Sequence, residues 1–266
     1  MKRLFFLGFL ASILFVSCSK DDDNNNNEST PLKADFTVTV TGESPNAKVA
    51  IVNNSTGATT YSWTFGEGAD ISSSSDKTPA IITVDKSGDF SIKLVVKNST
   101  SEKELSKNIT INGNNAIVEY KDVEFGLNAG DDTYGRLFSF ETGLIYKDNE
   151  ITNDNGSKIH LAFGSMSNTM YYFESPTVKD YNIPNATETK VINYESEPTI
   201  SVATFDEMTD DRELSGLTIE GTNDSFGNSS IPGTVLFEIS TGRKGVIKTK
   251  SVDDKKLVVD IKIQKY

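Results

Sequence analysis

Residues 61–68 have the sequence YSWTFGEG, which is the strongest indication of the fold of the N-terminal part of the chain. Its aromatic residues alternate with polar ones, which is the pattern of a β-strand with one buried face. Trp63 is therefore expected between two sheets, flanked on the same face by Tyr61 and Phe65. An exposed platform for stacking on sugars is the alternative for Trp63. The two glycines predict a tight turn after the strand, because glycine adopts positive φ angles without strain.

Short alternating segments extend from this stretch in both directions. They lie at residues 35–40, 48–52, 81–84, 90–96 and 105–111. Turns rich in Asn, Ser and Gly separate them, and no helical period is sustained. Segments of about six residues at this spacing predict a β-sandwich.

Two motifs in this region resemble those of a known family. Residues 61–68 resemble the Tyr-x-Trp-Asp-Phe-Gly-Asp-Gly signature of PKD domains, although Thr64 and Glu67 replace the residues usual at two positions. Residues 87–98 resemble the Gly-x-Tyr-x-Val-x-Leu-x-Val-x-Asn strand of the same family. The resemblance covers residues 33–113 and implies an immunoglobulin-like β-sandwich that serves as a spacer or interaction module.

Residues 114–266 form a second unit with the same alternating character. The expected strands are 117–125, 136–141, 158–163, 170–174, 235–240, 245–250 and 257–264. Thr204 and Glu207 form a capping-box pattern, which predicts one short helix over residues 205–214. Its inward side chains would be Phe205, Met208 and Leu214. The expected fold class is therefore all-β, with a PKD-like sandwich followed by a second β-sandwich-like domain with one short helix.

Two similar strings occur in the second unit, LFSFETG at residues 137–143 and LFEISTG at residues 236–242. Each alternates and then ends in a Thr-Gly turn, so we interpret them as two strand–turn units of one sandwich. Residues 138–143, 171–176 and 204–206 also resemble segments of a β-rich C-terminal region in surface lipoproteins of the Bacteroidota type. That resemblance implies a setting at the cell surface and no assigned activity.

The N-terminus has the organisation of a lipoprotein signal peptide, expected over residues 1–17. Lys2 and Arg3 precede an apolar run at residues 4–16, which is shorter than the ~20 residues that span a bilayer. A buried core helix is the alternative, but an acidic tract follows the run directly.

Residues 15–18, with the sequence FVSC, resemble a lipobox that would be cleaved between Ser17 and Cys18. Cys18 is the only cysteine, so the fold has no internal disulfide. We expect Cys18 to be lipidated, and two or three acyl chains on it form a stable membrane anchor. An ordinary secreted protein with one free thiol is the alternative.

Residues 18–32 contain almost no apolar side chains and predict a disordered acidic tether. Its first part resembles the export signal of Bacteroidota-type surface lipoproteins, which implies display on the outer face of the outer membrane. A solvated linker is the alternative. The residues concerned are Ser19, Lys20, Asp21, Asp22 and Asp23.

The chain is acidic, with 26 Lys and Arg against 38 Asp and Glu, and its net charge is −12. This charge argues against nucleic acid as a partner, because phosphate binding requires clustered cations. It also argues against adhesion of the protein surface to anionic lipid. Contact with a membrane is therefore expected through the lipid anchor alone.

Catalytic and metal-binding patterns are not evident in the sequence. His160 is the only histidine and is expected to be an ordinary strand residue, so no Cys/His metal cluster is predicted. No Gly-x-Ser-x-Gly motif accompanies it. A carboxylate pair remains open, because glycosidase carboxylates have no required spacing. The sequence predicts no catalytic residue, no cofactor and no metal site.

Each of three polar loops has both a functional and an ordinary structural interpretation. Residues 148–150 and 153–156 are rich in oxygen-bearing side chains without the calcium-loop spacing, so a structural calcium is a minor alternative. Residues 221–233 form a long loop of the kind that binds ligands on rigid β scaffolds. An ordinary surface loop is the competing interpretation.

Tyr171, Tyr172 and Phe173 are the candidate ligand contacts. Alternation places Tyr171 and Phe173 on one face of their strand and Tyr172 on the other. The outward face then exposes aromatic rings that can stack on a sugar or pack on another protein. Packing of the rings inside the domain is the alternative.

Taken together, these features predict an outer-membrane surface lipoprotein that acts as a non-catalytic binding module, for glycan or another extracellular polymer. Its partners would be polysaccharide or a surface protein, besides the membrane. The first alternative is a structural or protein-interaction component at the cell surface. The second is a glycoside hydrolase with a carboxylate pair.

Overall fold

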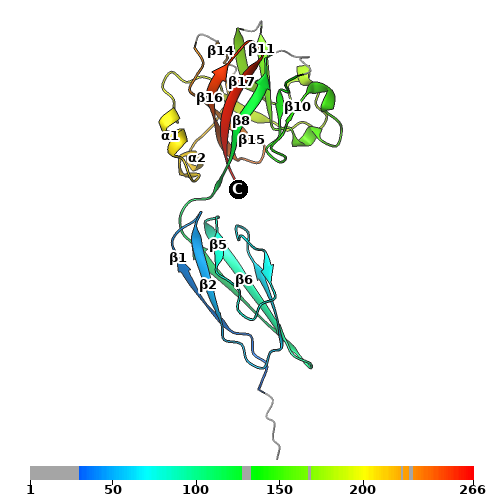
Figure 1. Ribbon diagram of the computed structural model, residues 1–266, viewed down its shortest axis with the longest axis vertical. Coiled ribbons are helices and arrows are strands. Elements are labelled where there is room, and N and C mark those ends of the chain that lie inside the picture. The colour runs from blue at the N-terminus through cyan, green and yellow to red at the C-terminus, as the bar shows by residue number, and fades with distance from the viewer. Residues whose placement is uncertain (1–29, 128–132, 167–168, 223, 228–229) are drawn as a thin grey trace, which may run out of the picture.

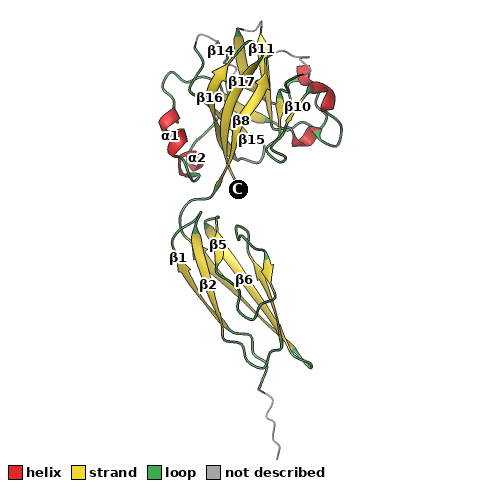
Figure 2. Ribbon diagram, viewed as in Figure 1, coloured by secondary structure: helices red, strands yellow, loops and turns green. Residues whose placement is uncertain are grey.

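The computed structural model describes residues 30–127, 133–166, 169–222, 224–227 and 230–266. Two β-rich domains lie end to end in it (Figure 1), and strands far outnumber helices (Figure 2). The predicted signal peptide at residues 1–17, Cys18 and the export signal at residues 19–23 lie outside the described residues. Within them, every helix is too short or too polar to span a bilayer.

The N-terminal domain is a sandwich of two antiparallel sheets, with strand orders β1-β2-β5 and β4-β3-β6-β7. Every strand predicted for this region is present. The additional strand β4 was not predicted, because its two serines carry no apolar alternation. The bounds are β1 (Phe36–Thr41), β2 (Ala47–Asn53), β3 (Thr60–Phe65), β4 (Ser73–Ser74), β5 (Ile82–Val84), β6 (Gly88–Lys97) and β7 (Glu102–Ile111).

Trp63 lies at the centre of this sandwich and is fully buried. Its ring contacts Phe36 edge-on, with ring centroids 5.2 Å apart, and its indole N–H donates to the carbonyl of Asp76 at 2.9 Å. Gly68 has a φ of +90°, as the predicted turn requires. Trp63 is therefore a core residue, and the alternative of a sugar platform at this position is wrong.

The C-terminal domain packs two five-stranded antiparallel sheets face to face, with orders β10-β9-β11-β12-β14 and β13-β15-β16-β17-β8. Among the described residues of this domain, three 3-10 helices, named η1 to η3, and two short α-helices accompany the sheets. The strands are β8 (Ile117–Gly126), β9 (Leu137–Phe138), β10 (Ile145–Tyr146), β11 (Leu161–Met166), β12 (Met170–Glu174), β13 (Thr189–Ile192), β14 (Phe226–Gly227), β15 (Thr234–Ile239), β16 (Lys244–Val252) and β17 (Lys256–Gln264). The helices are η1 (Asp148–Glu150), η2 (Gly156–Lys158), η3 (Lys179–Tyr181), α1 (Val202–Glu207) and α2 (Arg212–Ser215).

Two predicted strands of this domain are shorter or shifted. The strand expected at residues 136–141 is reduced to β9, because the Ser139 hydroxyl accepts hydrogen bonds from the backbone N–H groups of Glu141 and Thr142 and turns the chain. The strand expected at residues 158–163 begins only at Leu161, since η2 precedes it. Strands β10, β13 and β14 were not predicted, because such short edge strands show no clear period.

The two similar strings belong to opposite sheets, through β9 and β15. Their turns both contain a glycine with positive φ, +69° at Gly143 and +85° at Gly242. Phe140, which follows β9, stacks on Phe237 of β15 with ring centroids 5.0 Å apart and an interplanar angle of 3°. The interpretation as two strand–turn units of one sandwich is confirmed.

The predicted single helix is instead the pair α1 and α2. Ser201 caps α1, since its hydroxyl accepts from the backbone N–H of Thr204 at 3.1 Å, so the proposed cap at Thr204 is wrong. The inward positions are confirmed, because Phe205, Met208 and Leu214 are buried. They pack on the outer face of the β15–β16 sheet and cover part of it.

Candidate functional site

The three candidate ligand contacts lie on opposite faces of strand β12. Tyr171 and Phe173 are 2% and 1% exposed, and their rings pack in the aromatic core around Phe163. A ligand on the surface cannot touch them, so the expectation of ligand contact is corrected for these two residues. Tyr172 lies on the opposite, outer face and is half-buried. The side-chain alternation was predicted, but not which face is the outer one.

The ring of Tyr172 lies directly over Gly164 of β11, its partner in the antiparallel register. A Cβ atom at Gly164 would stand 2.3 Å from that ring, so only glycine leaves room for it to lie across the sheet. Next along the hairpin, Met166 and Met170 are also paired and are 57% and 42% exposed. We call this surface, made of Gly164, Met166, Met170 and Tyr172, the Tyr172 face.

A polar cluster closes one end of the Tyr172 face. The hydroxyl of Tyr181 donates to Glu174, which follows Tyr172 on the same side of β12. The guanidinium of Arg136 lies 4.5 Å from the Tyr181 ring centroid, and its Nε donates to Asp148 at 2.8 Å. Burial raises the pKa of Glu174, although the Tyr181 hydroxyl and Arg136 oppose this effect. The cluster therefore fixes the side chains beside Tyr172.

The carboxylates of this cluster form hydrogen bonds with neighbouring side chains and so have a structural role. Glu174 accepts from Tyr181, and Asp148 accepts from Arg136, whose pKa this bond raises. Among the described residues, Glu174 and Asp148 do not form a free acid–base pair across a cleft. In the same part of the chain, no three His, Cys, Asp or Glu side chains are grouped as a metal site.

The oxygen-rich loops at residues 148–150 and 153–156 use their side chains internally. Glu150 accepts from the backbone N–H of Lys147 at 2.8 Å. Asn155 accepts from the N–H of Thr152 at 2.7 Å and donates to the Glu150 carbonyl at 2.9 Å. These bonds account for the composition of the loops, so the structure favours ordinary polar turns over a calcium site.

His160 lies just before β11 and is half-buried. Its Nδ1 accepts a hydrogen bond from the N–H of Phe140 at 3.2 Å. Burial lowers the pKa of His160, and the nearby Arg243 lowers it further. The imidazole is therefore neutral near pH 7 and supports the turn after β9, which is a structural role.

The polar loop at residues 221–233 is only partly described, and its described ends are attached to the domain. Thr222 donates its N–H to the Val191 carbonyl at 2.7 Å, and Phe226 is buried in β14. The Phe226 ring packs beside the Tyr171 ring, with ring centroids 6.1 Å apart. This part of the loop therefore belongs to the sheet that contains β12.

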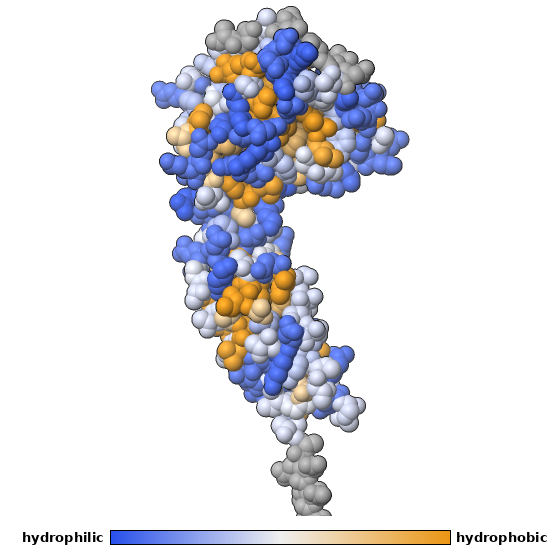
Figure 3. Space-filling model, in the orientation of Figure 1, coloured by the Kyte–Doolittle hydropathy of each residue, from blue (hydrophilic) through white to orange (hydrophobic). Residues whose placement is uncertain are grey.

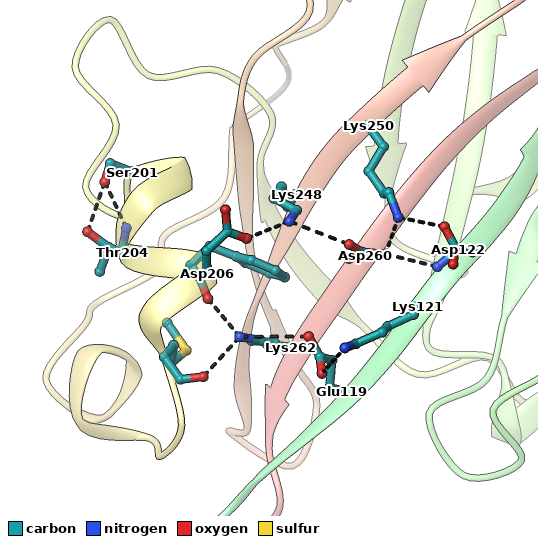
Figure 4. Close-up of polar contacts among 12 residues, drawn as sticks. Glu119, Lys121, Asp122, Ser201, Thr204, Asp206, Lys248, Lys250, Asp260 and Lys262 are labelled. Atoms are coloured by element: carbon teal, nitrogen blue, oxygen red, sulfur yellow. Dashed lines mark hydrogen bonds and ion pairs between the residues drawn. The ribbon is translucent and has the colours of Figure 1, made fainter.

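The opposite sheet carries a network of charged side chains on its outer face (Figure 4). Asp260 accepts from Lys250 at 3.2 Å and from the Asp122 N–H at 2.9 Å, where β8 and β17 shift register. Lys248 and Lys262 reach toward α1 from β16 and β17. These charges are paired, so this face holds elements together and is not a free anion-binding surface.

Gly164, Met166 and Met170, which share the outer face with Tyr172, were not predicted from the sequence. A glycine inside an alternating strand indicates close approach by another group, and this signal is present at Gly164. The partner of that glycine depends on hairpin register, which the sequence does not show directly.

Comparison with curated proteins and with solved structures gives no significant match to the chain. Residues 26–111 match the PKD domain family. The matched span includes all seven strands of the N-terminal sandwich and both resembling motifs. Residues 26–111 therefore constitute a PKD domain, followed by a β-rich domain that the match does not cover.

Proposed function

We propose that this protein is a non-catalytic binding module displayed on the outer surface of the outer membrane by a lipid on Cys18. The PKD domain and the all-β fold are typical of extracellular binding or structural modules. The lipobox-like residues 15–18 support the anchor, and the acidic residues 19–23 support surface export. The PKD domain then separates the C-terminal domain from the membrane.

The C-terminal domain carries the ligand site in this proposal, and glycan is the ligand class. The observation that carries it is the Tyr172 ring, which lies across Gly164 on the outer side of the sheet and is only half-buried. A ring already held in place across a sheet packs against the apolar C–H face of a sugar without losing side-chain freedom on binding. Met166 and Met170 extend the apolar surface beside it.

The test is binding of the chain from residue 18 to residue 266 to an array of polysaccharides. We expect binding to at least one glycan and a roughly tenfold weaker affinity for Tyr172→Ala, equivalent to about 1.4 kcal/mol. Tyr194→Ala is the matched control, because Tyr194 is 50% exposed and lies outside the Tyr172 face. Absence of glycan binding, or equal loss in both variants, would contradict the proposal.

A protein-interaction role is the second candidate, and exposed apolar residues on the PKD domain favour it. Val52 of β2 and Ile81, which directly precedes β5, are 58% and 64% exposed. Apolar surface is visible on this domain in Figure 3. If this role holds, replacing both residues by Lys abolishes cross-linking to a surface protein on intact cells, whereas Tyr172→Ala does not.

A further inference from the structure

A groove of about 1040 Å³ lies on the C-terminal domain, away from the residues of the Tyr172 face. Residues 151–153 form one side, and residues 176–179 and 182–186 form the other. Sites for small ligands are typically about 300–1,000 Å³, so the groove is large enough for several sugar units. Neither the family match nor the sequence motifs assign a role to it.

Three asparagine side chains line the groove: Asn153, Asn182 and Asn185. All three are exposed, and in the described part of the chain their amide groups make no hydrogen bond to protein. Asn155, in contrast, uses both ends of its amide to hold the same loop. An amide carries two donors and an acceptor, which matches a hydroxyl group that both donates and accepts.

The charge of the lining is unusual for this chain. Lys179 is the one charged residue among the described residues that line the groove, and none of them is acidic. The whole chain has 38 acidic residues and a net charge of −12. A polycation would find no carboxylate here, and a polyanion would meet a single lysine within the negative field of the protein. An uncharged ligand fits the lining best.

The apolar part of the lining complements the amides. Pro176, Val178, Ile183 and Pro184 line the groove between them. Sugar rings present C–H groups as well as hydroxyls, so a site for uncharged sugars requires both kinds of surface. No aromatic residue lines the groove in the described part of the chain, which distinguishes it from the Tyr172 face.

The two sides of the groove are held together beneath the surface. Gly156 is buried against Pro184, and a Cβ at Gly156 would stand 2.0 Å from the Pro184 carbonyl oxygen. Tyr181, between the two lining segments of the second side, packs with Leu137 and Ile159 in a small core. The groove is therefore formed before any ligand binds, which reduces the ordering cost of binding.

We infer that this groove binds an uncharged oligosaccharide through the amides of Asn153, Asn182 and Asn185. The inference rests on the proposed function for the class of ligand, but it assigns a different site. Asn182 and Asn185 have φ angles of +48° and +58°, a conformation that glycine adopts freely. Asn182→Gly and Asn185→Gly therefore remove the amides and keep the backbone.

The experiment titrates the chain from residue 18 to residue 266 with uncharged maltohexaose, cellohexaose and mannohexaose, and with anionic hexagalacturonate. We expect at least one uncharged hexasaccharide to shift the side-chain amide signals of the three asparagines in ¹H–¹⁵N spectra. The triple variant Asn153→Ala, Asn182→Gly, Asn185→Gly should raise its Kd at least tenfold. Asn108→Ala, at an exposed asparagine of β7, is the matched control and should leave the Kd unchanged.

Gly156→Ala is a second variant, because it separates the two sides without altering any lining residue; it should also raise the Kd. If the Kd is unchanged in the triple variant and binding is lost in Tyr172→Ala, the groove is not the binding site. The proposed function is then still supported. Binding of hexagalacturonate alone overturns the uncharged class. No shift of the three asparagine signals with any of the four probes overturns the groove as a binding site, and the glycan proposal itself falls only if the polysaccharide array also shows no binding.

Discussion

Asp211 accepts hydrogen bonds from both the backbone N–H and the side-chain amide of Asn115, at 2.8 and 3.1 Å. Asp211 is 2% exposed, and the amide of Gln264 also donates to it at 3.0 Å. Asn115 lies between the domains, and its amide oxygen accepts from the N–H of Ser87 in the PKD domain at 3.0 Å. One asparagine is thus bonded to both domains.

Further contacts support the same junction. Asp85 of the PKD domain accepts from Lys265 at 2.6 Å and from the hydroxyl of Tyr266. Lys86 lies 4.8 Å from the centroid of the Tyr266 ring. Hydrogen bonds and an ion pair therefore hold the two domains together at this joint, and we expect the domains to move together.

Asp211→Ala should loosen this joint. The substitution leaves the donors of Asn115 and Gln264 without their acceptor, which costs about 1–3 kcal/mol for buried groups. We expect small-angle X-ray scattering to show a broader range of inter-domain distances. Asp254→Ala, at an exposed position in the β16–β17 turn, should leave the scattering unchanged. Identical profiles for wild type and Asp211→Ala would show that the joint does not depend on this carboxylate.

Lys262→Met should destabilise the C-terminal domain. The buried ammonium of Lys262 donates to the carbonyls of Phe205 and Met208 at 2.7 and 2.9 Å and so holds the end of α1 (Figure 4). Methionine fills the space but leaves the Met208 carbonyl without its donor, while the Phe205 carbonyl keeps only the backbone N–H of Met208. Losing the ammonium costs roughly 1–3 kcal/mol. Urea unfolding followed by circular dichroism measures this change. Lys121→Met is the control, because the Lys121 side chain is 66% exposed and exposed ion pairs contribute about 0–1 kcal/mol.

Asp260 should make stability depend on pH in the acidic range. Burial alone would raise its pKa, but the Asp122 N–H, Lys250 and Lys248 outweigh burial and hold the pKa below its ordinary value of 3.8. The ionised group therefore stabilises the fold above about pH 4, and this contribution is lost as the pH falls through the folded-state pKa.

The measurement is the urea midpoint of wild type and Asp260→Asn between about pH 6 and about pH 2. The difference between the two proteins should be largest at the upper end and shrink toward the lower end. A constant difference across this range would contradict the assigned direction of the pKa shift.

Gly164→Ala should weaken glycan binding without altering any side chain that contacts the ligand. The new methyl group would stand 2.3 Å from the Tyr172 ring and push it off the sheet. We expect an affinity loss similar to that of Tyr172→Ala in the same array. Gly216→Ala is the control, because a Cβ there meets no atom within 4 Å. Wild-type affinity in Gly164→Ala would mean that the position of the Tyr172 ring across Gly164 is not required for binding.

Cys18→Ala should release the protein from membranes into the soluble fraction, because acyl chains on Cys18 form the proposed anchor. Fractionation followed by immunoblotting measures the release. Ser29→Ala, in the polar segment before the PKD strands, should stay with the membrane. Membrane retention of Cys18→Ala would place the anchor elsewhere.

Much of the strand pattern was accessible from the sequence, because a half-buried strand repeats every two residues wherever it lies. The segments around Trp63, Phe90 and Ile261 all show this repeat, and all are strands. The cap of α1 was misplaced because Ser201 and Thr204 both suit the position, and only backbone geometry distinguishes them.

The candidate site was accessible only in part. Alternation predicted that Tyr172 opposes Tyr171 and Phe173, but both faces of β12 are partly apolar. The groove was not predicted, because its asparagines are turn residues whose sequence resembles that of any polar loop. Their convergence depends on the contact of Gly156 with Pro184, from segments far apart along the chain.

The all-β class, the PKD domain and the central position of Trp63 follow from the sequence alone, because they depend on local periodicity and on a motif within eight consecutive residues. Tertiary structure decided that Tyr172 faces outward, that three free amides meet in one groove, and that Asp211 bonds to Asn115, 96 residues away. Such relationships arise from sheet register and from the packing of distant segments, and neither leaves a periodic trace in the chain.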